Sequence, residues 1–120
     1  MEVVATDEFV TWLESLSAGH RGSVEDAINV LSGAGTSLGH PRASAIKGTR
    51  FAIRELRVQS KGRPLRIFYA FDPRRDAVLI LGGDKGGDAR FYERTLPRVE
   101  AIWRQYLTEQ AAGLHDDKEE

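Results

Sequence analysis

Apolar and polar residues at the start of the chain favour a short strand followed by a helix. Residues 2–5 are rich in β-branched side chains, as strands are. Apolar side chains then recur at helical spacing from Phe9 to Leu16, which places them on one face. Thr6 or Asp7 is suited to cap this helix, because a short polar side chain can accept a hydrogen bond from a free N–H of the first turn.

A second helix is predicted over residues 22–31. Residues 17–19 interrupt the first helical pattern, and Ser23 with Asp26 resembles a capping pair at the start of the next one. Apolar residues again fall on one side of this segment. We therefore expect the two short helices to form a helical hairpin.

Three strand-like segments follow a loop that contains glycine and proline, and they predict an antiparallel meander. The expected strands are 45–59, 65–71 and 77–81, with turns at 61–64 and 72–76. Alternation in the middle strand places Leu65 and Ile67 on one face and Arg66 and Phe68 on the other.

The last part of the chain predicts a helix and a tail. The glycine-rich segment 82–88 is expected to close the sheet, and Thr95 is a possible cap for a helix with Pro97 in its first turn. Residues 111–120 are predicted to be a flexible, polar and acidic tail, after a single domain over residues 1–110.

These elements together predict an α+β fold. An N-terminal strand and a two-helix hairpin would pack on an antiparallel sheet meander, with a helix at the C-terminus. The helices that precede the meander are expected to cover one face of the sheet. The other face, with Arg66 and neighbouring arginines, would remain partly open.

The composition excludes several kinds of site. There is no cysteine, so disulfides and thiolate metal sites are excluded, and His20, His40 and His115 lie too far apart in sequence for a metal-binding motif. We expect no metal and no cofactor, and we expect the histidines in loops and in the tail. The chain lacks a signal-peptide pattern and any run near the roughly 20 apolar residues of a membrane span. A cytoplasmic protein without a membrane partner is expected.

Basic residues gather in the middle of a chain whose formal net charge is only −1. Between residues 47 and 66 the single acid is Glu55. Arginine exceeds lysine there, and the guanidinium group matches phosphate geometry. The segment therefore indicates an anionic partner, while the alternative is a solvated sheet edge whose charges prevent aggregation. The candidate phosphate and RNA contacts are Lys47, Arg50, Arg54, Lys61 and Arg63.

Several short phrases, in a fixed order, resemble the RelE/ParE toxin superfamily and most of all its HigB-like branch. The phrases are Ser37-Leu38-Gly39-His40-Pro41, Ile46-Lys47-Gly48, Glu55-Leu56-Arg57, Arg66-Ile67-Phe68-Tyr69, Leu81-Gly82-Gly83-Asp84-Lys85 and Phe91-Tyr92-Glu93-Arg94. The resemblance implies a microbial RNase fold and the toxin of a type II toxin–antitoxin system, which cuts messenger RNA in the ribosomal A site. The implied partners are mRNA, the 70S ribosome and a HigA-like helix-turn-helix antitoxin. Operator DNA would be bound only through this antitoxin.

Carried onto this chain, the resemblance implies four catalytic residues. Arg57 and Arg66 match sheet arginines, Lys85 matches a basic residue after the last strand, and Tyr92 matches an aromatic residue near the final helix. Arg54 is matched to a strand lysine of the family. The implied chemistry needs no metal, because the 2′-hydroxyl of RNA can attack the adjacent phosphate. Arginines would stabilise the phosphate charge, and a lysine or tyrosine would move protons.

Each of these residues also has a purely structural interpretation. Arg66 can be a solvent-facing strand residue, and Arg57 can pair with Glu55 on the same strand face. Lys85 can be an exposed loop residue, and Tyr92 can dock the last helix onto the sheet. The sequence also departs from the family pattern: Glu55 stands near the position of a lysine, and glycines at 86–87 replace further basic residues.

Three other functions stay open at this point. A ParE-like toxin with this fold would poison DNA gyrase without RNA chemistry, since fold alone does not fix function. A non-catalytic RNA-binding module would use the basic face only to hold phosphates. An inactive toxin homologue is the third. The basic and aromatic set favours the nuclease.

Overall fold

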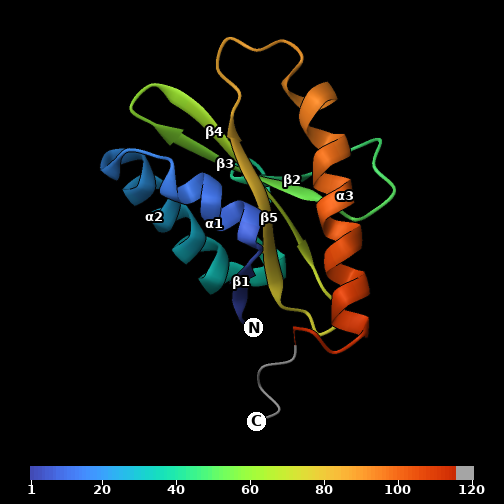
Figure 1. The fold of residues 1–120 in the computed structure, drawn as a ribbon. Helices are drawn as coiled ribbons and strands as arrows, with labels where there is room; N and C mark the ends of the chain where they lie inside the picture. The colour runs from blue at the N-terminus through green and yellow to red at the C-terminus, as the bar shows by residue number, and fades with distance from the viewer. Residues whose placement is uncertain (116–120) are drawn as a thin grey trace.

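The computed structural model describes residues 1–115, which fold into three α-helices, one short 3₁₀ turn and one five-stranded sheet (Figure 1). The elements are β1 (Val3–Ala5), α1 (Asp7–Glu14), α2 (Ala18–Ala34), η1 (Gly35–Ser37), β2 (Ala43–Ala45), β3 (Arg54–Ser60), β4 (Arg63–Phe71), β5 (Ala77–Asp84) and α3 (Phe91–Ala111). The acidic tail predicted from residue 111 lies outside the described residues from residue 116 onward.

The sheet has the strand order β1-β5-β4-β3-β2. Its centre is the expected antiparallel meander of β3, β4 and β5. The N-terminal strand was predicted without a place in the sheet, and it pairs with β5 in parallel, so the complete sheet is mixed. Helices α1 and α2 take the chain from β1, at one edge of the sheet, to β2 at the other edge, and the strands β3 and β4 then lead back to β5 beside β1.

The strand expected over residues 45–59 is two strands, β2 and β3, separated by a loop. Gly48 has a φ of 85°, a left-handed conformation that interrupts an extended strand. The loop returns on itself, so that the N–H of Ile46 donates to the carbonyl of Ile53 over 2.9 Å. As a result, β2 pairs with only the first three residues of β3.

The cap of α1 is as expected, while that of α2 is not. The side chain of Thr6 accepts a hydrogen bond from the N–H of Phe9. In α2 the cap is Ser17 rather than Ser23, so the helix begins at Ala18, four residues before the predicted start. His20 therefore lies in a helix and not in a loop, and its Nδ1 is 2.7 Å from the hydroxyl of Ser60.

Helix α3 also begins earlier than predicted. Thr95 is not its cap, and Pro97 lies beyond its first turn, because the helix starts at Phe91. The side chain of Phe91 is buried against Phe68 of β4, with their ring centroids 6.0 Å apart. This packing holds the first turn of α3 on the sheet upstream of the proline.

Helices cover both faces of the sheet, with α1 and α2 on one side and α3 on the other (Figure 1). The predicted alternation in β4 is confirmed, since Leu65 and Ile67 pack in the cluster under α1 and α2, while Phe68 packs under α3. The expectation that the face of Arg66 stays partly open is wrong. The N-terminal half of α3 covers that face, and Arg66 is only 9% exposed.

The two glycines at the end of β5 are explained by packing. Residues 82–84 were expected to form part of a loop, but β5 continues to Asp84. A Cβ atom on Gly82 would lie 2.2 Å from the ring of Trp12 in α1, and one on Gly83 would lie 2.8 Å from the ring of Phe91. The glycines therefore let helices on both faces approach the strand closely.

Candidate active site on the α3 face of the sheet

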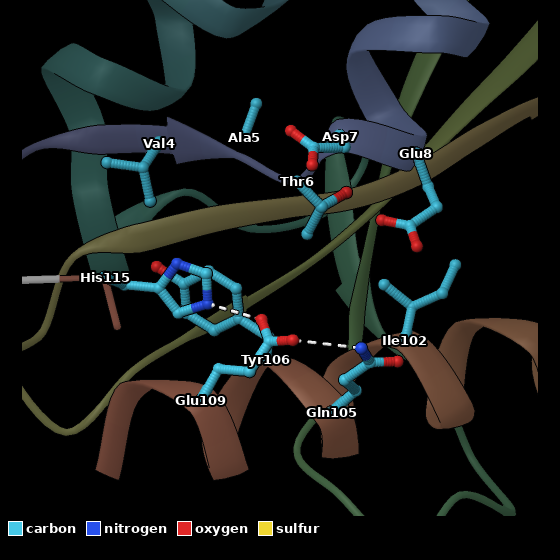
Figure 2. A pocket seen from close by; sticks show the side chains of 10 residues that line it. All are labelled: Val4, Ala5, Thr6, Asp7, Glu8, Ile102, Gln105, Tyr106, Glu109 and His115. Atoms are coloured by element: carbon cyan, nitrogen blue, oxygen red, sulfur yellow. Dashed lines mark hydrogen bonds and ion pairs between the residues drawn. The ribbon is translucent and has the colours of Figure 1, made fainter. Parts of the chain in front are cut away.

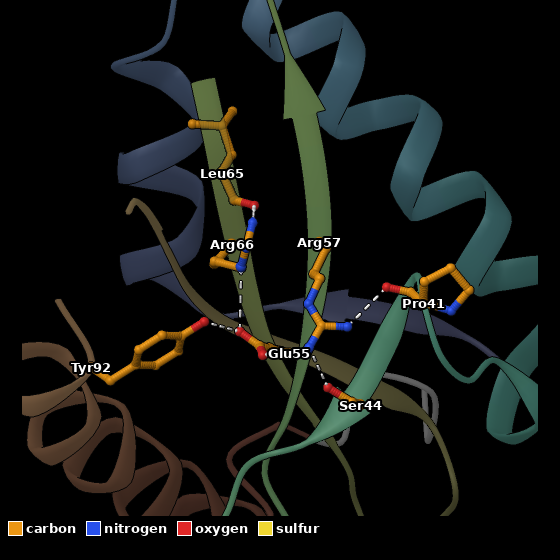
Figure 3. Close-up of polar contacts among 7 residues, drawn as sticks. All are labelled: Pro41, Ser44, Glu55, Arg57, Leu65, Arg66 and Tyr92. Carbon is orange, nitrogen blue, oxygen red and sulfur yellow. Dashed lines mark hydrogen bonds and ion pairs between the residues drawn. The ribbon is translucent and has the colours of Figure 1, made fainter. Parts of the chain in front are cut away.

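Three side chains converge on the carboxylate of Glu55 (Figure 3). The phenol of Tyr92 donates a hydrogen bond of 2.5 Å to its Oε1 atom. The Nε atom of Arg66 lies 3.5 Å from the same oxygen, and the guanidinium of Arg57 lies 3.2 Å from Oε2. The carboxylate thus joins two central strands and the first turn of α3.

Strand register brings these residues together. Arg57 of β3 lies directly opposite Arg66 of β4, and Glu55 lies two residues from Arg57. Because side chains alternate between faces along a strand, all three point to the face that α3 covers. Tyr92 reaches the same place from the start of α3, next to the buried Phe91 that anchors the helix.

One hydrogen-bond donor of Arg66 is without an acceptor among residues 1–115. Its Nη1 atom donates to the carbonyl of Leu65 over 3.0 Å. Its Nε atom is buried and has no hydrogen-bond partner in the part of the chain that the structure describes. Glu55 is 6% exposed, so both charges lie largely out of water. A buried N–H without a partner is rare and costs free energy, and a catalytic role is one of the reasons for which a protein retains such a group.

Arg57 is held in place from several sides. Its guanidinium donates to the carbonyl of Pro41 and to the hydroxyl of Ser44, over 2.9 Å in each case. The predicted pairing with Glu55 is confirmed. Its side chain is 33% exposed, so it links the buried carboxylate to the surface.

Tyr92 is a phenol that stays protonated at neutral pH. Burial raises the pKa of Tyr92 above its usual value, and the hydrogen bond to Glu55 raises that pKa further, while Arg66 opposes the shift. The Nζ atom of Lys85 lies 5.8 Å from the centroid of the Tyr92 ring, as a cation over an aromatic face. All four residues that the sequence predicted to be catalytic therefore lie in one cluster around Glu55, which we call the Glu55 cluster.

The predicted RNA contacts do not share this location. Arg54 lies on the opposite face of β3, where it donates to the hydroxyl of Tyr69 and to the carbonyl of Leu38. Arg63 is paired with Asp84, whose carboxylate is 2.7 Å away and has a pKa held below its usual value by this hydrogen bond.

The remaining predicted contacts lie in turns and loops. Lys61 is in the β3–β4 turn, with its side chain close to Gly19 of α2. Lys47 and Arg50 lie in the loop between β2 and β3, where the backbone N–H of Arg50 donates to Glu100 of α3. The basic segment is thus distributed over both faces and one edge of the sheet.

Glu55 is the residue that sequence reasoning did not assign to the site. It appeared there only as a departure from the family pattern and as an ion-pair partner of Arg57. A signal was present, because Glu55 is the single acid of the basic segment and shares a strand face with Arg57. Its contact with Tyr92 joins residues 37 positions apart, and no local pattern contains that information.

Away from the Glu55 cluster, a hollow of about 280 Å³ lies between the N-terminal elements and the C-terminal half of α3 (Figure 2). It is lined by Val4, Ala5, Thr6, Asp7, Glu8, Ile102, Gln105, Tyr106, Glu109 and His115. Within it, Glu109 is held by Gln105 and by His115, at 2.9 and 2.8 Å. It contains none of the predicted site residues.

Residues 1–115 contain no group of three or more histidine, cysteine, aspartate or glutamate side chains placed to hold a metal ion. Over the same range, no helix combines the length and the apolar character that crossing a membrane requires.

Comparisons with known proteins place the chain in a family. Residues 11–104 match the family described as phage-derived protein Gp49-like. Two proteins of Mycobacterium tuberculosis (strain ATCC 25618 / H37Rv) that bear toxin names are similar. HigB3 is 33% identical over 115 residues, which cover 94% of this chain and 99% of HigB3. HigB2 is 33% identical over 101 residues, which cover 82% of this chain and 50% of HigB2.

One solved structure was also matched, the archaeal RelE–RelB complex from Pyrococcus horikoshii OT3. The match covers 72% of this chain and 96% of that chain, with a TM-score of 0.48 and 16% identity. The family match and the identity to HigB3 span most of the sequence. The chain belongs to the Gp49-like family, in the HigB-like branch of the RelE/ParE toxin superfamily.

Proposed function

We propose that this protein is the toxin of a toxin–antitoxin system and acts as a ribosome-dependent endoribonuclease on messenger RNA, with the Glu55 cluster as its cutting site. The observation that carries the proposal is the buried Nε donor of Arg66, which lies beside a carboxylate, a second arginine and a protonated phenol. This set contains an anion-binding group and two proton-transfer groups, which cleavage of RNA by its own 2′-hydroxyl requires.

The two arginines bind the scissile phosphate. Arg66 supplies its Nε donor, which lies 3.5 Å from Oε1 of Glu55 and makes no hydrogen bond within residues 1–115, and Arg57 supplies guanidinium donors from the partly exposed edge of the cluster. Donors fixed where negative charge develops lower the barrier without reorganisation, and one such donor contributes about 10²–10³-fold in related acyl-transfer sites. The existing contacts of Arg57 with Pro41 and Ser44 keep its guanidinium aligned.

Protons move through Glu55 and Tyr92. The carboxylate of Glu55 accepts the proton of the 2′-hydroxyl as its oxygen forms a bond to phosphorus. The bond from phosphorus to the 5′-oxygen breaks, and that oxygen takes the phenol proton of Tyr92. The products are a 2′,3′-cyclic phosphate and a 5′-hydroxyl. The raised pKa of Tyr92 suits the role of proton donor, since the group is protonated at neutral pH.

Tyr92 also covers the carboxylate that the substrate must reach. Its hydroxyl is bonded to Oε1 of Glu55, and Glu55 and Arg66 are both buried. RNA binding therefore requires the phenol to leave Glu55 and to turn toward the leaving oxygen. Lys85, over the Tyr92 ring, lies where it can pair with the phosphate as the ring moves.

The proposal includes partners. Relatives that bear toxin names support a cognate antitoxin, and we propose a HigA-like helix-turn-helix protein that alone contacts operator DNA. Messenger RNA on the 70S ribosome is the proposed substrate, in the cytoplasm, with no metal or cofactor in the reaction.

The test is inducible expression in a bacterium, with mapping of the 5′ ends of cellular mRNA. Wild type is expected to arrest growth and to create new in-frame cuts inside translated messages. Arg66→Gln is expected to abolish both, and Arg54→Gln, which changes the same residue type on the opposite face of the sheet, is expected to keep them. Soluble protein levels are measured for all three, so that misfolding is recognised.

Other outcomes would redirect the assignment. Growth arrest with intact messages and induced DNA damage would contradict the nuclease and would indicate a toxin that poisons DNA gyrase. Wild-type protein that binds RNA but causes neither growth arrest nor cuts would indicate a non-catalytic RNA-binding module. Wild-type protein that neither binds RNA nor cuts it would indicate an inactive toxin homologue.

A further inference from the structure

The outward side of α3 carries a row of arginines that neither the sequence prediction nor the proposed cutting site includes. This arginine face consists of Arg90, Arg94, Arg98 and Arg104, and all four are exposed. At 3.6 residues per turn, they fall within an arc of roughly 120° around the helix. Figure 1 shows α3 alone on its side of the sheet, so no other helix lies over its outer surface.

Among residues 1–115, most of these arginines are not paired with an acid. Arg94 is paired with Asp88, and the guanidinium of Arg104 lies 5.5 Å from the ring centroid of Phe51. The side chains of Arg90 and Arg98 make no hydrogen bond and no ion pair within residues 1–115.

The acids of the same helix offset only part of it. Glu93 is exposed at the border of the arginine face. Glu100 lies toward the loop between β2 and β3, where one of its oxygens accepts the backbone N–H of Arg50. The four arginines outnumber these two acids, so the N-terminal two-thirds of the outward side carries a net positive charge, and it begins at the turn that carries Tyr92.

We infer that the arginine face is a second RNA-binding surface, which holds phosphates of the RNA backbone outside the cutting site. The inference rests on the proposed function and adds a partner surface to it. Guanidinium groups match phosphate geometry and remain charged at any physiological pH. Contacts with phosphates release counterions, so they contribute affinity that depends on salt and not on sequence. Arg90 flanks Tyr92, so RNA in the Glu55 cluster can continue onto this face.

The test measures how binding depends on salt. The probe is an RNA hairpin with 2′-O-methyl groups, which cannot be cut by 2′-hydroxyl attack. Each phosphate contact contributes about 0.7–0.9 to the slope of log affinity against log salt. Arg90→Gln/Arg98→Gln is expected to reduce this slope by about 1.5 and to weaken binding several-fold at low salt. The matched control is Arg42→Gln/Arg75→Gln, which removes two exposed arginines elsewhere and is expected to leave the slope unchanged.

Three results would overturn the inference. The first is an unchanged slope in the α3 double variant, and the second is an equal reduction in the control, which would indicate net charge alone. The third is normal RNA binding with loss of the antitoxin complex, which would make the arginine face a protein interface. Cleavage on programmed ribosomes is measured separately. Wild type that shows the expected slope but never cuts would refute the proposed function while supporting the arginine face.

Discussion

Tyr92 donates a 2.5 Å hydrogen bond to Oε1 of Glu55, and this contact joins the first turn of α3 to the centre of the sheet. The same contact covers a carboxylate that also holds two arginines. Tyr92 therefore adds to the docking of the helix by Phe91 and also covers the Glu55 cluster. Variants at Tyr92 are expected to change stability and activity together, whereas variants elsewhere separate the two.

Tyr92→Phe is expected to lower the free energy of unfolding by about 1–2 kcal/mol, because a hydrogen bond to a charged group is lost while the ring still packs. The difference should depend on pH. Since the pKa of Tyr92 is raised in the folded state, its stabilising effect is fully present below the ordinary tyrosine pKa of about 10 and is lost as pH rises through the raised value. Denaturant unfolding at about pH 8 and about pH 11 measures this. A gap between wild type and variant that does not shrink at the higher pH would contradict it.

Arg54→Gln is expected to destabilise the protein by about 1–3 kcal/mol, since its bonds to Tyr69 and Leu38 are lost from a half-buried position. The cleavage rate per folded molecule should stay within about twofold of wild type, because this side chain lies on the face opposite the Glu55 cluster. Chemical denaturation and a single-turnover cleavage assay measure the two quantities. A large loss of cleavage rate with normal stability would contradict this and would give Arg54 a direct part in cleavage.

Gly82→Ala is expected to cost about 1–3 kcal/mol of stability, because the new methyl group would overlap the ring of Trp12. Gly22→Ala is the matched control. A Cβ atom there meets nothing within 4 Å, and the residue lies inside α2, so alanine should stabilise the helix by about 0.5–1 kcal/mol. Thermal unfolding measures whether each variant is less stable or more stable than wild type. If both substitutions change stability equally, Trp12 does not pack closely on β5.

The sequence predicted those elements whose cause is local. The cap at Thr6 and the alternation along β4 follow from side-chain type and from spacing, and both are confirmed. The start of α2 was misplaced because Ser17 and Ser23 are both acceptable caps, and only the packed structure distinguishes them. The parallel pairing of β1 with β5 joins residues more than 70 positions apart, beyond the reach of any local pattern.

In the site, too, some features were predictable from the sequence and others depend on the packed structure. Arg57, Arg66 and Tyr92 came from the resemblance, and their convergence required the β3–β4 register and the docking of α3. Strand alternation alone could have separated Arg54 from Arg57, since an odd spacing places them on opposite faces. That Glu55 would accept hydrogen bonds from another element could not be inferred, because the partner comes from α3.

The central claim is that Glu55 takes part in cutting RNA, and the single-turnover cleavage rate of Glu55→Gln on programmed ribosomes tests it most directly. The control is Glu93→Gln, which changes an exposed acid near Tyr92. Denaturant unfolding of each variant gives its folded fraction, since Arg66 loses a charged partner in the first variant. We expect the rate per folded molecule to fall by about 10²-fold or more for Glu55→Gln and to stay at the wild-type level for the control. A Glu55→Gln rate within about threefold of wild type would show that the Glu55 cluster only supports the fold, and would contradict the proposed cutting site.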